Sequence, residues 1–107
     1  PAMPDSIPAF FAGLPARVDP ARTAGIDTVF AFDIAGAGAW TVRLHGGAAQ
    51  VEEGIAADAR CTIKAKAQHF EEILDGRRNP MTAFMTGKLK VDGDMAAAMQ
   101  LKELFGQ

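Results

Sequence analysis

Residues 28–45 read TVFAFDIAGAGAWTVRLH, and this stretch decides the fold class of the chain. In each half of it, large apolar residues alternate with smaller or polar ones, which is the pattern of a β-strand with one buried face. The alternating large residues are Phe30, Phe32, Ile34, Trp40, Val42 and Leu44. Gly36 and Gly38 lie between the two halves and favour a tight turn. The stretch therefore predicts a β-hairpin with one apolar face.

The same alternation recurs further along the chain. We expect a third strand over residues 48–53, after the Gly46-Gly47 turn, and a fourth over residues 59–66. A fifth, over residues 88–92, places Leu89 and Val91 inward and charged side chains outward. Strands with one apolar face each predict an antiparallel sheet that is covered on one side only.

Helical spacing marks the segments around these strands. We expect a helix over residues 5–14, a turn or second helical piece over residues 16–24, and two short helices ending near Gly76 and Gly87. Asn79 followed by Pro80 is a typical start for the second short helix. Asp94 is the expected N-cap of a last helix over residues 95–105.

These elements predict an α+β fold, a two-layer sandwich of one five-stranded, mainly antiparallel sheet with helices packed on one face. The length of 107 residues suits a single domain over residues 1–107. We expect no linker and no internal repeat.

Composition excludes several classes of function. The formal charge of −2 and the pI near 5.6 argue against nucleic acid as a partner, since phosphate-binding domains usually carry a basic excess. A single cysteine excludes an internal disulfide and fits a reducing cytosol. No stretch approaches 18 consecutive apolar residues, so we expect no stable membrane insertion, only transient contact, and a cytoplasmic location.

The residues that carry chemistry in enzymes are poorly placed for it here. His45 alternates onto the polar face of the sheet, and His69 lies beside the buried stripe of its helix, so we interpret both as surface residues. Cys61 alternates onto the apolar face, where a thiol is usually inert. Gly36 and Gly38 resemble the start of a dinucleotide fingerprint, but they join two strands and open no helix. We therefore expect no catalytic residue, no metal ligand, no cofactor and no enzymatic activity.

The predicted inner surface is apolar and rich in Phe and Met. A filled core explains such a composition, and so does an adaptable apolar surface that binds varied ligands. Composition leaves both interpretations open.

Residues 79–101, NPMTAFMTGKLKVDGDMAAAMQL, resemble the signature of the sterol carrier protein-2 family of non-specific lipid-transfer proteins. The resemblance implies an apolar cavity for a fatty acid, fatty acyl-CoA, sterol or similar lipid, without catalytic residues. It implies a lining made of Phe10, Phe11, Leu14, Phe32, Trp40, Phe70, Ile73, Leu74, Phe84, Met85, Met95, Met99, Leu101 and Leu104. The chain ends in Phe-Gly-Gln and not in a peroxisomal Ser-Lys-Leu signal, which favours a bacterial-type cytoplasmic member.

The leading hypothesis is therefore non-catalytic binding and transfer of a small hydrophobic ligand. The alternative is an accessory or oligomerisation module with a filled core and no bound lipid. The oligomeric state does not follow from the sequence.

Overall fold

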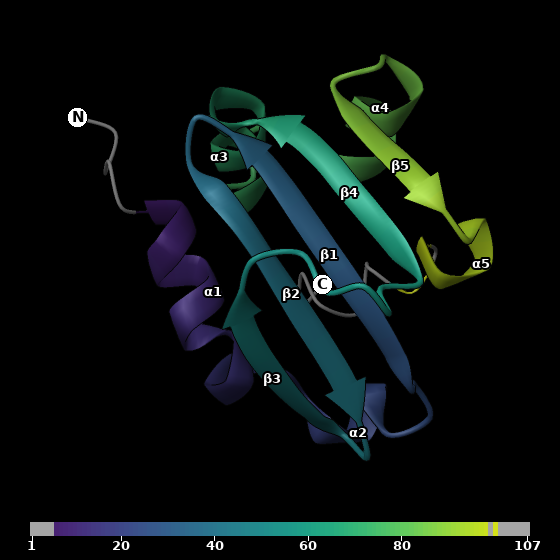
Figure 1. Ribbon diagram of the computed structural model, residues 1–107. Coiled ribbons are helices and arrows are strands. Elements are labelled where there is room, and N and C mark those ends of the chain that lie inside the picture. The colour runs from purple at the N-terminus through teal and green to yellow at the C-terminus, as the bar shows by residue number, and fades with distance from the viewer. Residues whose placement is uncertain (1–5, 99, 101–107) are drawn as a thin grey trace.

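The computed structural model describes residues 6–98 and residue 100 (Figure 1). The elements follow in the order α1 (Ser6–Arg17), α2 (Pro20–Thr23), β1 (Thr28–Ala35), β2 (Gly38–His45), β3 (Ala48–Glu53), β4 (Cys61–Lys66), α3 (Ala67–Leu74), α4 (Pro80–Met85), β5 (Leu89–Gly93) and α5 (Met95–Ala98). The predicted strands are thus all present, although β4 begins two residues later than expected and β5 is shifted by one residue.

The five strands form one sheet in the order β3-β2-β1-β4-β5. The pairs β1–β2, β2–β3 and β4–β5 are antiparallel, whereas β1 and β4 are parallel, with Phe32 opposite Ile63. The parallel pair follows from the long connection between β3 and β4, which carries the chain from one edge of the sheet to the far side of β1. The mainly antiparallel sheet is confirmed.

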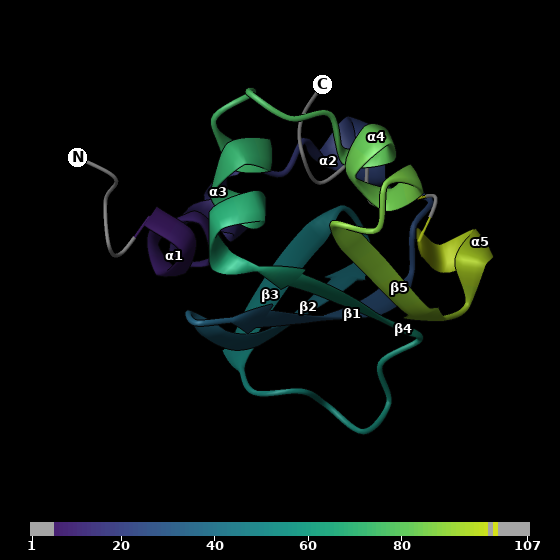
Figure 2. The same ribbon diagram turned by 90° about the horizontal axis from the view of Figure 1, so that it is seen from above.

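The helices lie on one face of this sheet, and the connection over residues 54–60 projects from the other (Figure 2). The alternation in the strands explains the two faces. Val42, Ile63 and Trp40 are buried on the helix side, while Lys64 and Lys90 are exposed on the open side. The two-layer α+β sandwich predicted from the sequence is confirmed.

Val91 differs from the expectation of an inward, buried strand residue. It is half-buried, because β5 is an edge strand with the sheet on one side only.

The first helix is longer than predicted. The sequence places its end near Leu14, but α1 continues through Pro15 to Arg17. Proline lacks only its own N–H, and the next turn still closes, since the Val18 N–H donates to the Leu14 carbonyl at 3.1 Å. The prediction was wrong because a proline close to the end of a helix removes a single hydrogen bond.

The predicted helix starts near the C-terminus are confirmed. The Asn79 side chain accepts hydrogen bonds from the N–H groups of Met81 at 2.8 Å and Thr82 at 3.3 Å, and Pro80 occupies the first turn of α4. Asp94 caps α5 by accepting from the Ala96 N–H at 2.9 Å. The predicted continuation of the last helix to residue 105 lies outside the described residues.

The connection over residues 54–60 is held against the open face by two residues of β2. The buried Thr41 hydroxyl donates to the Gly54 carbonyl at 2.7 Å and accepts from the Ala56 N–H at 2.9 Å. Arg43 bonds both Glu52 and Asp58, which half-buries its side chain and raises its pKa. The alternation in β2 turns Arg43 to the open face, and its ion pairs with these two carboxylates keep its side chain half-buried there.

Candidate functional site

Five aromatic rings from both layers meet at the centre of the molecule. They belong to Phe10, Phe11, Phe32, Trp40 and Phe70, and we call them the aromatic cluster. The Phe11 ring stacks on Trp40 with centroids 4.6 Å apart and on Phe70 at 5.9 Å, and it meets Phe32 at 5.1 Å. Phe10 adds edge contacts to Phe11 and Phe70. Phe11 therefore joins α1, α3 and the sheet.

Local sequence explains how these rings come together. In α1, Ile7, Phe10, Phe11 and Leu14 follow the spacing of one helical face, and all four are buried. The sheet supplies Phe32 and Trp40, which are directly opposite each other in the β1–β2 register. Phe70 reaches the cluster from α3, whose outer face is polar.

The lining predicted from the sequence separates into three groups. The structure brings together the buried side chains, Phe10, Phe11, Leu14, Phe32, Trp40, Phe70 and Ile73, with Leu74 half-buried beside them. It leaves Phe84 and Met85 at the surface, 37% and 77% exposed. Met99, Leu101 and Leu104 lie outside the described residues, as does the side chain of Met95.

One contact to this layer carried no signal in the sequence. The Thr28 hydroxyl at the start of β1 donates to the Gln100 side-chain oxygen at 2.8 Å. The two residues are 72 positions apart, and an isolated Thr and Gln match no motif. Their hydrogen bond ties the end of the described chain to the central strand.

Buried polar side chains are few among the described residues, and each is hydrogen-bonded. The buried polar side chains of the described residues are Thr23, Thr28 and Thr41. Each makes a hydrogen bond, to the Asp19 carbonyl, to Gln100 and to the 54–60 connection respectively. None has a hydroxyl left for activation by a neighbouring base.

Cys61 lies on the inner face of β4 and is 1% exposed. Burial, with a smaller contribution from the negative charge of Asp94, raises the pKa of its thiol to about 11. A thiol with so high a pKa is a poor nucleophile at neutral pH. His45 is exposed, with its Nδ1 3.4 Å from Asp27, and His69 is half-buried on α3.

The described residues form neither a metal site nor a membrane-spanning helix. Within residues 6–98 and residue 100, no group of three or more His, Cys, Asp and Glu side chains is placed to hold a metal ion. In the same part of the chain, the helices are too short or too polar to cross a bilayer. What the inner layer offers chemically is apolar and aromatic surface.

Comparison with known proteins adds a family and a fold. The model of the SCP-2 sterol transfer family matches residues 11–106. Sterol carrier protein 2 of Gallus gallus is 38% identical over 84 residues, which cover 74% of this chain and 15% of that protein. The hydroxysteroid dehydrogenase-like protein 2 of Homo sapiens is 32% identical over 82 residues, which cover 74% of this chain and 20% of that protein. The chain thus spans less than a quarter of the length of these curated relatives.

Among solved structures, the crystal structure of sterol carrier protein 2 like 2 from Aedes aegypti is similar to this chain with a TM-score of 0.74 and 25% identity. The match covers 92% of this chain and 94% of that one. The solution structure of palmitated SCP2L2 from the same organism has a TM-score of 0.75 at 24% identity, covering 95% and 96% of the two chains. Both likenesses cover more than nine-tenths of this chain and show that it shares their fold.

Proposed function

The chain belongs to the SCP-2 sterol transfer family, and from this premise we propose that it binds a long-chain hydrophobic ligand and carries it through water. The ligand class is a fatty acid, a fatty acyl-CoA, a sterol or a similar lipid. The proposed site lies between the helical layer and the apolar face of the sheet.

The observation that best supports this proposal is the aromatic cluster between α1, α3 and the sheet. It offers apolar surface from α1, α3 and the sheet, and the buried hydroxyls of the described residues are already hydrogen-bonded. Transfer of one methylene from water to such a surface stabilises binding by about 0.8 kcal/mol, which is about fourfold in affinity. A long acyl chain therefore needs no charged anchor to be held.

We assign the ligand contacts to Phe10, Phe11, Leu14, Phe32, Trp40, Phe70 and Ile73, with Leu74 at their border. Met95, Met99, Leu101 and Leu104 are proposed as further contacts on the resemblance to the family alone, since Met99, Leu101, Leu104 and the Met95 side chain lie outside the described part of the chain. Phe84 and Met85 remain predicted contacts, although exposed side chains are the least suited to a ligand shielded from water. We propose no catalytic residue, no cofactor and a cytoplasmic location.

A second function is favoured by the match to the dehydrogenase-like protein, of which this chain spans 20%. In that arrangement the domain would be an accessory module of a longer enzyme. A close-packed aromatic cluster suits such a module, because its core needs no room for a ligand.

Native mass spectrometry of the purified protein, before and after lipid extraction, separates the two functions. A co-purifying lipid mass supports the carrier. A protein that remains free of ligand after incubation with long-chain fatty acids supports the accessory module.

The single tryptophan gives a second measurement. Trp40 belongs to the aromatic cluster, so a polyene fatty acid bound there should quench Trp40 emission by energy transfer. Trp40→Phe is the control, because it removes the donor and keeps an aromatic ring. Affinity that rises about fourfold with each added methylene, until the site is full, supports a buried acyl chain; affinity independent of chain length contradicts it.

A further inference from the structure

Helix α4 presents its apolar side chains to water. Met81, Phe84 and Met85 are 52%, 37% and 77% exposed, whereas Ala83 is completely buried. Positions i, i+3 and i+4 share one face of a helix, so the three large residues form a single stripe. Because the small Ala83 takes the inward position, this stripe points outward.

Lysines gather where β4 ends and β5 begins. Lys64 is directly opposite Lys90 in the β4–β5 register, and Lys66 and Lys88 follow at the same end of the two strands. Like charges on adjacent strands repel each other, so this arrangement is destabilising for the sheet itself.

The nearby carboxylates leave most of this charge uncompensated. Lys64 is neutralised by Asp92 at 3.6 Å and lies beside Asp33 of β1 in register. On the neighbouring turn, Asp75 binds Arg77 and Glu72 binds Arg78. Across the part of the chain that the structure describes, Lys66, Lys88 and Lys90 have no carboxylate within ion-pair distance.

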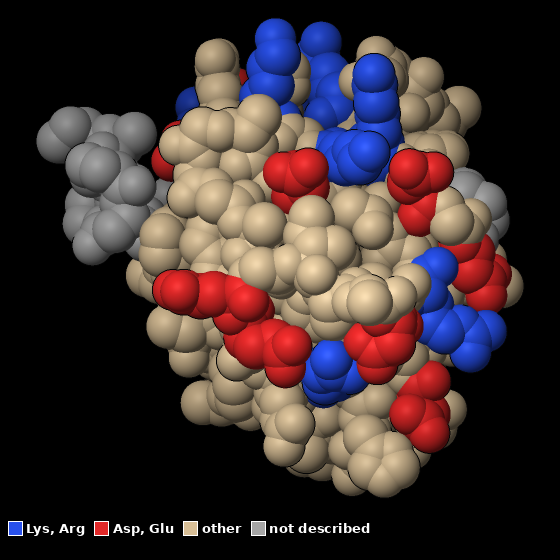
Figure 3. Space-filling model, in the orientation of Figure 1, with Lys and Arg blue, Asp and Glu red and all other residues tan. Residues whose placement is uncertain are grey.

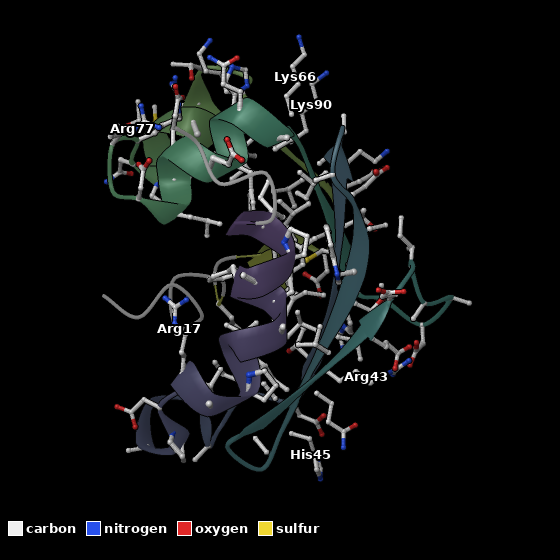
Figure 4. All side chains as sticks on the ribbon, turned by 90° about the vertical axis from the view of Figure 1, so that its left-hand side faces the viewer. Arg17, Arg43, His45, Lys66, Arg77 and Lys90 are labelled. Atoms are coloured by element: carbon white, nitrogen blue, oxygen red, sulfur yellow. The ribbon has the colours of Figure 1, made fainter. Side chains whose placement is uncertain are left out.

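The apolar stripe and these lysines lie at one end of the molecule. Lys66, Lys90 and Arg77 project from the same end in Figure 4, and α4 leads directly into β5 at that end in Figures 1 and 2. On the open face, blue Lys and Arg side chains gather along the upper edge, and most Asp and Glu side chains lie below them (Figure 3). Positive side chains thus gather at one end of a chain whose formal charge is −2.

We propose that this end, formed by Met81, Phe84, Met85, Lys66, Lys88 and Lys90, docks on the surface of an anionic lipid bilayer. Exposed apolar side chains enter the interface between headgroups and acyl chains, and lysines beside them contact the anionic headgroups. An acidic protein would match the lysines but not the apolar stripe. A net negative chain is repelled by such a bilayer at long range, so the lysine end also orients the approach.

The biological role of this docking rests on the proposed function, since a carrier must contact a membrane to load and release its ligand. The docking itself requires no ligand in the aromatic cluster. An experiment with empty vesicles therefore tests the surface separately from the carrier activity.

The test is flotation of the protein with vesicles of phosphatidylcholine alone and of phosphatidylcholine mixed with phosphatidylserine, at low and high salt. We expect binding to the anionic vesicles only, weakened by salt because screening shortens the range of the attraction. The double variant Lys66→Gln/Lys90→Gln should bind about 25-fold more weakly, since each lysine near the surface contributes about fivefold. Fatty-acid binding by this variant, measured through Trp40, should be unchanged.

Matched controls locate the surface. Arg17→Gln/Arg60→Gln removes the same charge from α1 and from the opposite end of β4, and should bind vesicles like the wild type. Met85→Ser should reduce vesicle binding, whereas Ile55→Ser, an exposed apolar residue in the 54–60 connection, should not. All the substituted side chains are exposed, so thermal melts should show folded proteins.

Three results would overturn the proposal. They are a wild type that does not bind anionic vesicles, a wild type that binds neutral and anionic vesicles equally, and an equal loss of vesicle binding in the two charge-matched double variants. Self-association in sedimentation velocity that Met85→Ser abolishes, in a protein that does not bind vesicles, would assign the stripe to contact between copies of this chain.

Discussion

The Phe11 ring lies parallel to Trp40, with 13° between their planes and 4.6 Å between their centroids. The two residues belong to different layers, so this stack joins the first helix to the sheet. Both residues are also proposed ligand contacts, so a shift of α1 relative to the sheet would change the proposed site directly. A ligand that enters between the layers must displace this stack or lie beside it.

Phe11→Ala should therefore be the most informative truncation in the cluster. Phe11 is fully buried, and removal of a buried phenyl ring usually costs about 3 to 5 kcal/mol of unfolding free energy. Urea denaturation followed by far-UV circular dichroism measures the loss. Phe84→Ala is the matched control, because its ring is 37% exposed and should cost much less. Equal losses of unfolding free energy in the two variants would contradict the interpretation that Phe11 joins the helices to the sheet.

Thr41→Val should release the connection over residues 54–60. The substitution removes one hydrogen bond to Gly54 and leaves the Ala56 N–H without its acceptor, which usually costs about 1 to 3 kcal/mol. Hydrogen exchange at Ala56 should accelerate, and urea denaturation should show lower stability. Thr62→Val on β4 is the control, since within residues 6–98 and residue 100 the Thr62 hydroxyl makes no hydrogen bond. Unchanged exchange at Ala56 would show that Arg43 holds the connection without Thr41.

Cys61 should react slowly with thiol reagents in the folded protein and rapidly after unfolding. Burial restricts access and raises the pKa of the thiol to about 11, so little thiolate is present at neutral pH. Mass spectrometry of protein alkylated with and without urea measures the two rates. Rapid alkylation of the folded protein at neutral pH would return Cys61 to consideration as a nucleophile.

The same pKa makes a prediction for alkaline stability. The folded state holds the thiol proton more tightly than the unfolded state, in which the pKa of the thiol is near 9.0. The resulting stability is fully present below pH 9 and is lost as the pH rises toward 11. Cys61→Ala should lose less of its stability across this interval than the wild type does, as measured by thermal melts at a series of pH values. Parallel pH profiles would contradict the assignment.

Glu72 should contribute to instability in acid. Its hydrogen bond with Arg78, together with the charges of Arg78 and Arg77, holds the pKa of Glu72 below its usual range. A lowered carboxyl pKa stabilises the fold at neutral pH, and this contribution disappears as the pH falls through that lowered value. The melting temperature of Glu72→Gln should fall less than that of the wild type as the pH is lowered. Melting temperatures that fall equally in the two proteins as the pH is lowered would contradict this role of Glu72.

Much of the fold could be predicted because local signals agree with it. The alternation in residues 28–45 predicted both strands and their buried faces, and Asn79 with Pro80 predicted the start of α4. The long α1 was missed because its continuation depends on one surviving hydrogen bond after Pro15. The half-burial of Val91 follows from strand order, which alternation within a strand does not contain.

The site was less predictable than the fold. Periodicity selected Phe10, Phe11 and Phe70 as inward residues, but which ring touches which depends on the crossing of α1 and α3 over the sheet. In α4 the same periodicity was ambiguous, because a stripe at i, i+3 and i+4 has one spacing whether it faces the core or water. The buried Ala83 settles its direction, and only packing shows it.

The parallel pairing of β1 and β4 has a consequence for how the chain folds. Strands β1, β2 and β3 follow one another through short turns, so their contacts form between near neighbours in sequence. The register of Phe30 with Cys61 requires a much longer loop to close, which slows its formation. We expect the β1–β2–β3 meander to gain protection first in pulse-labelled hydrogen exchange. The β4–β5 half, with the lysine end and α4, should then assemble on it as the later unit.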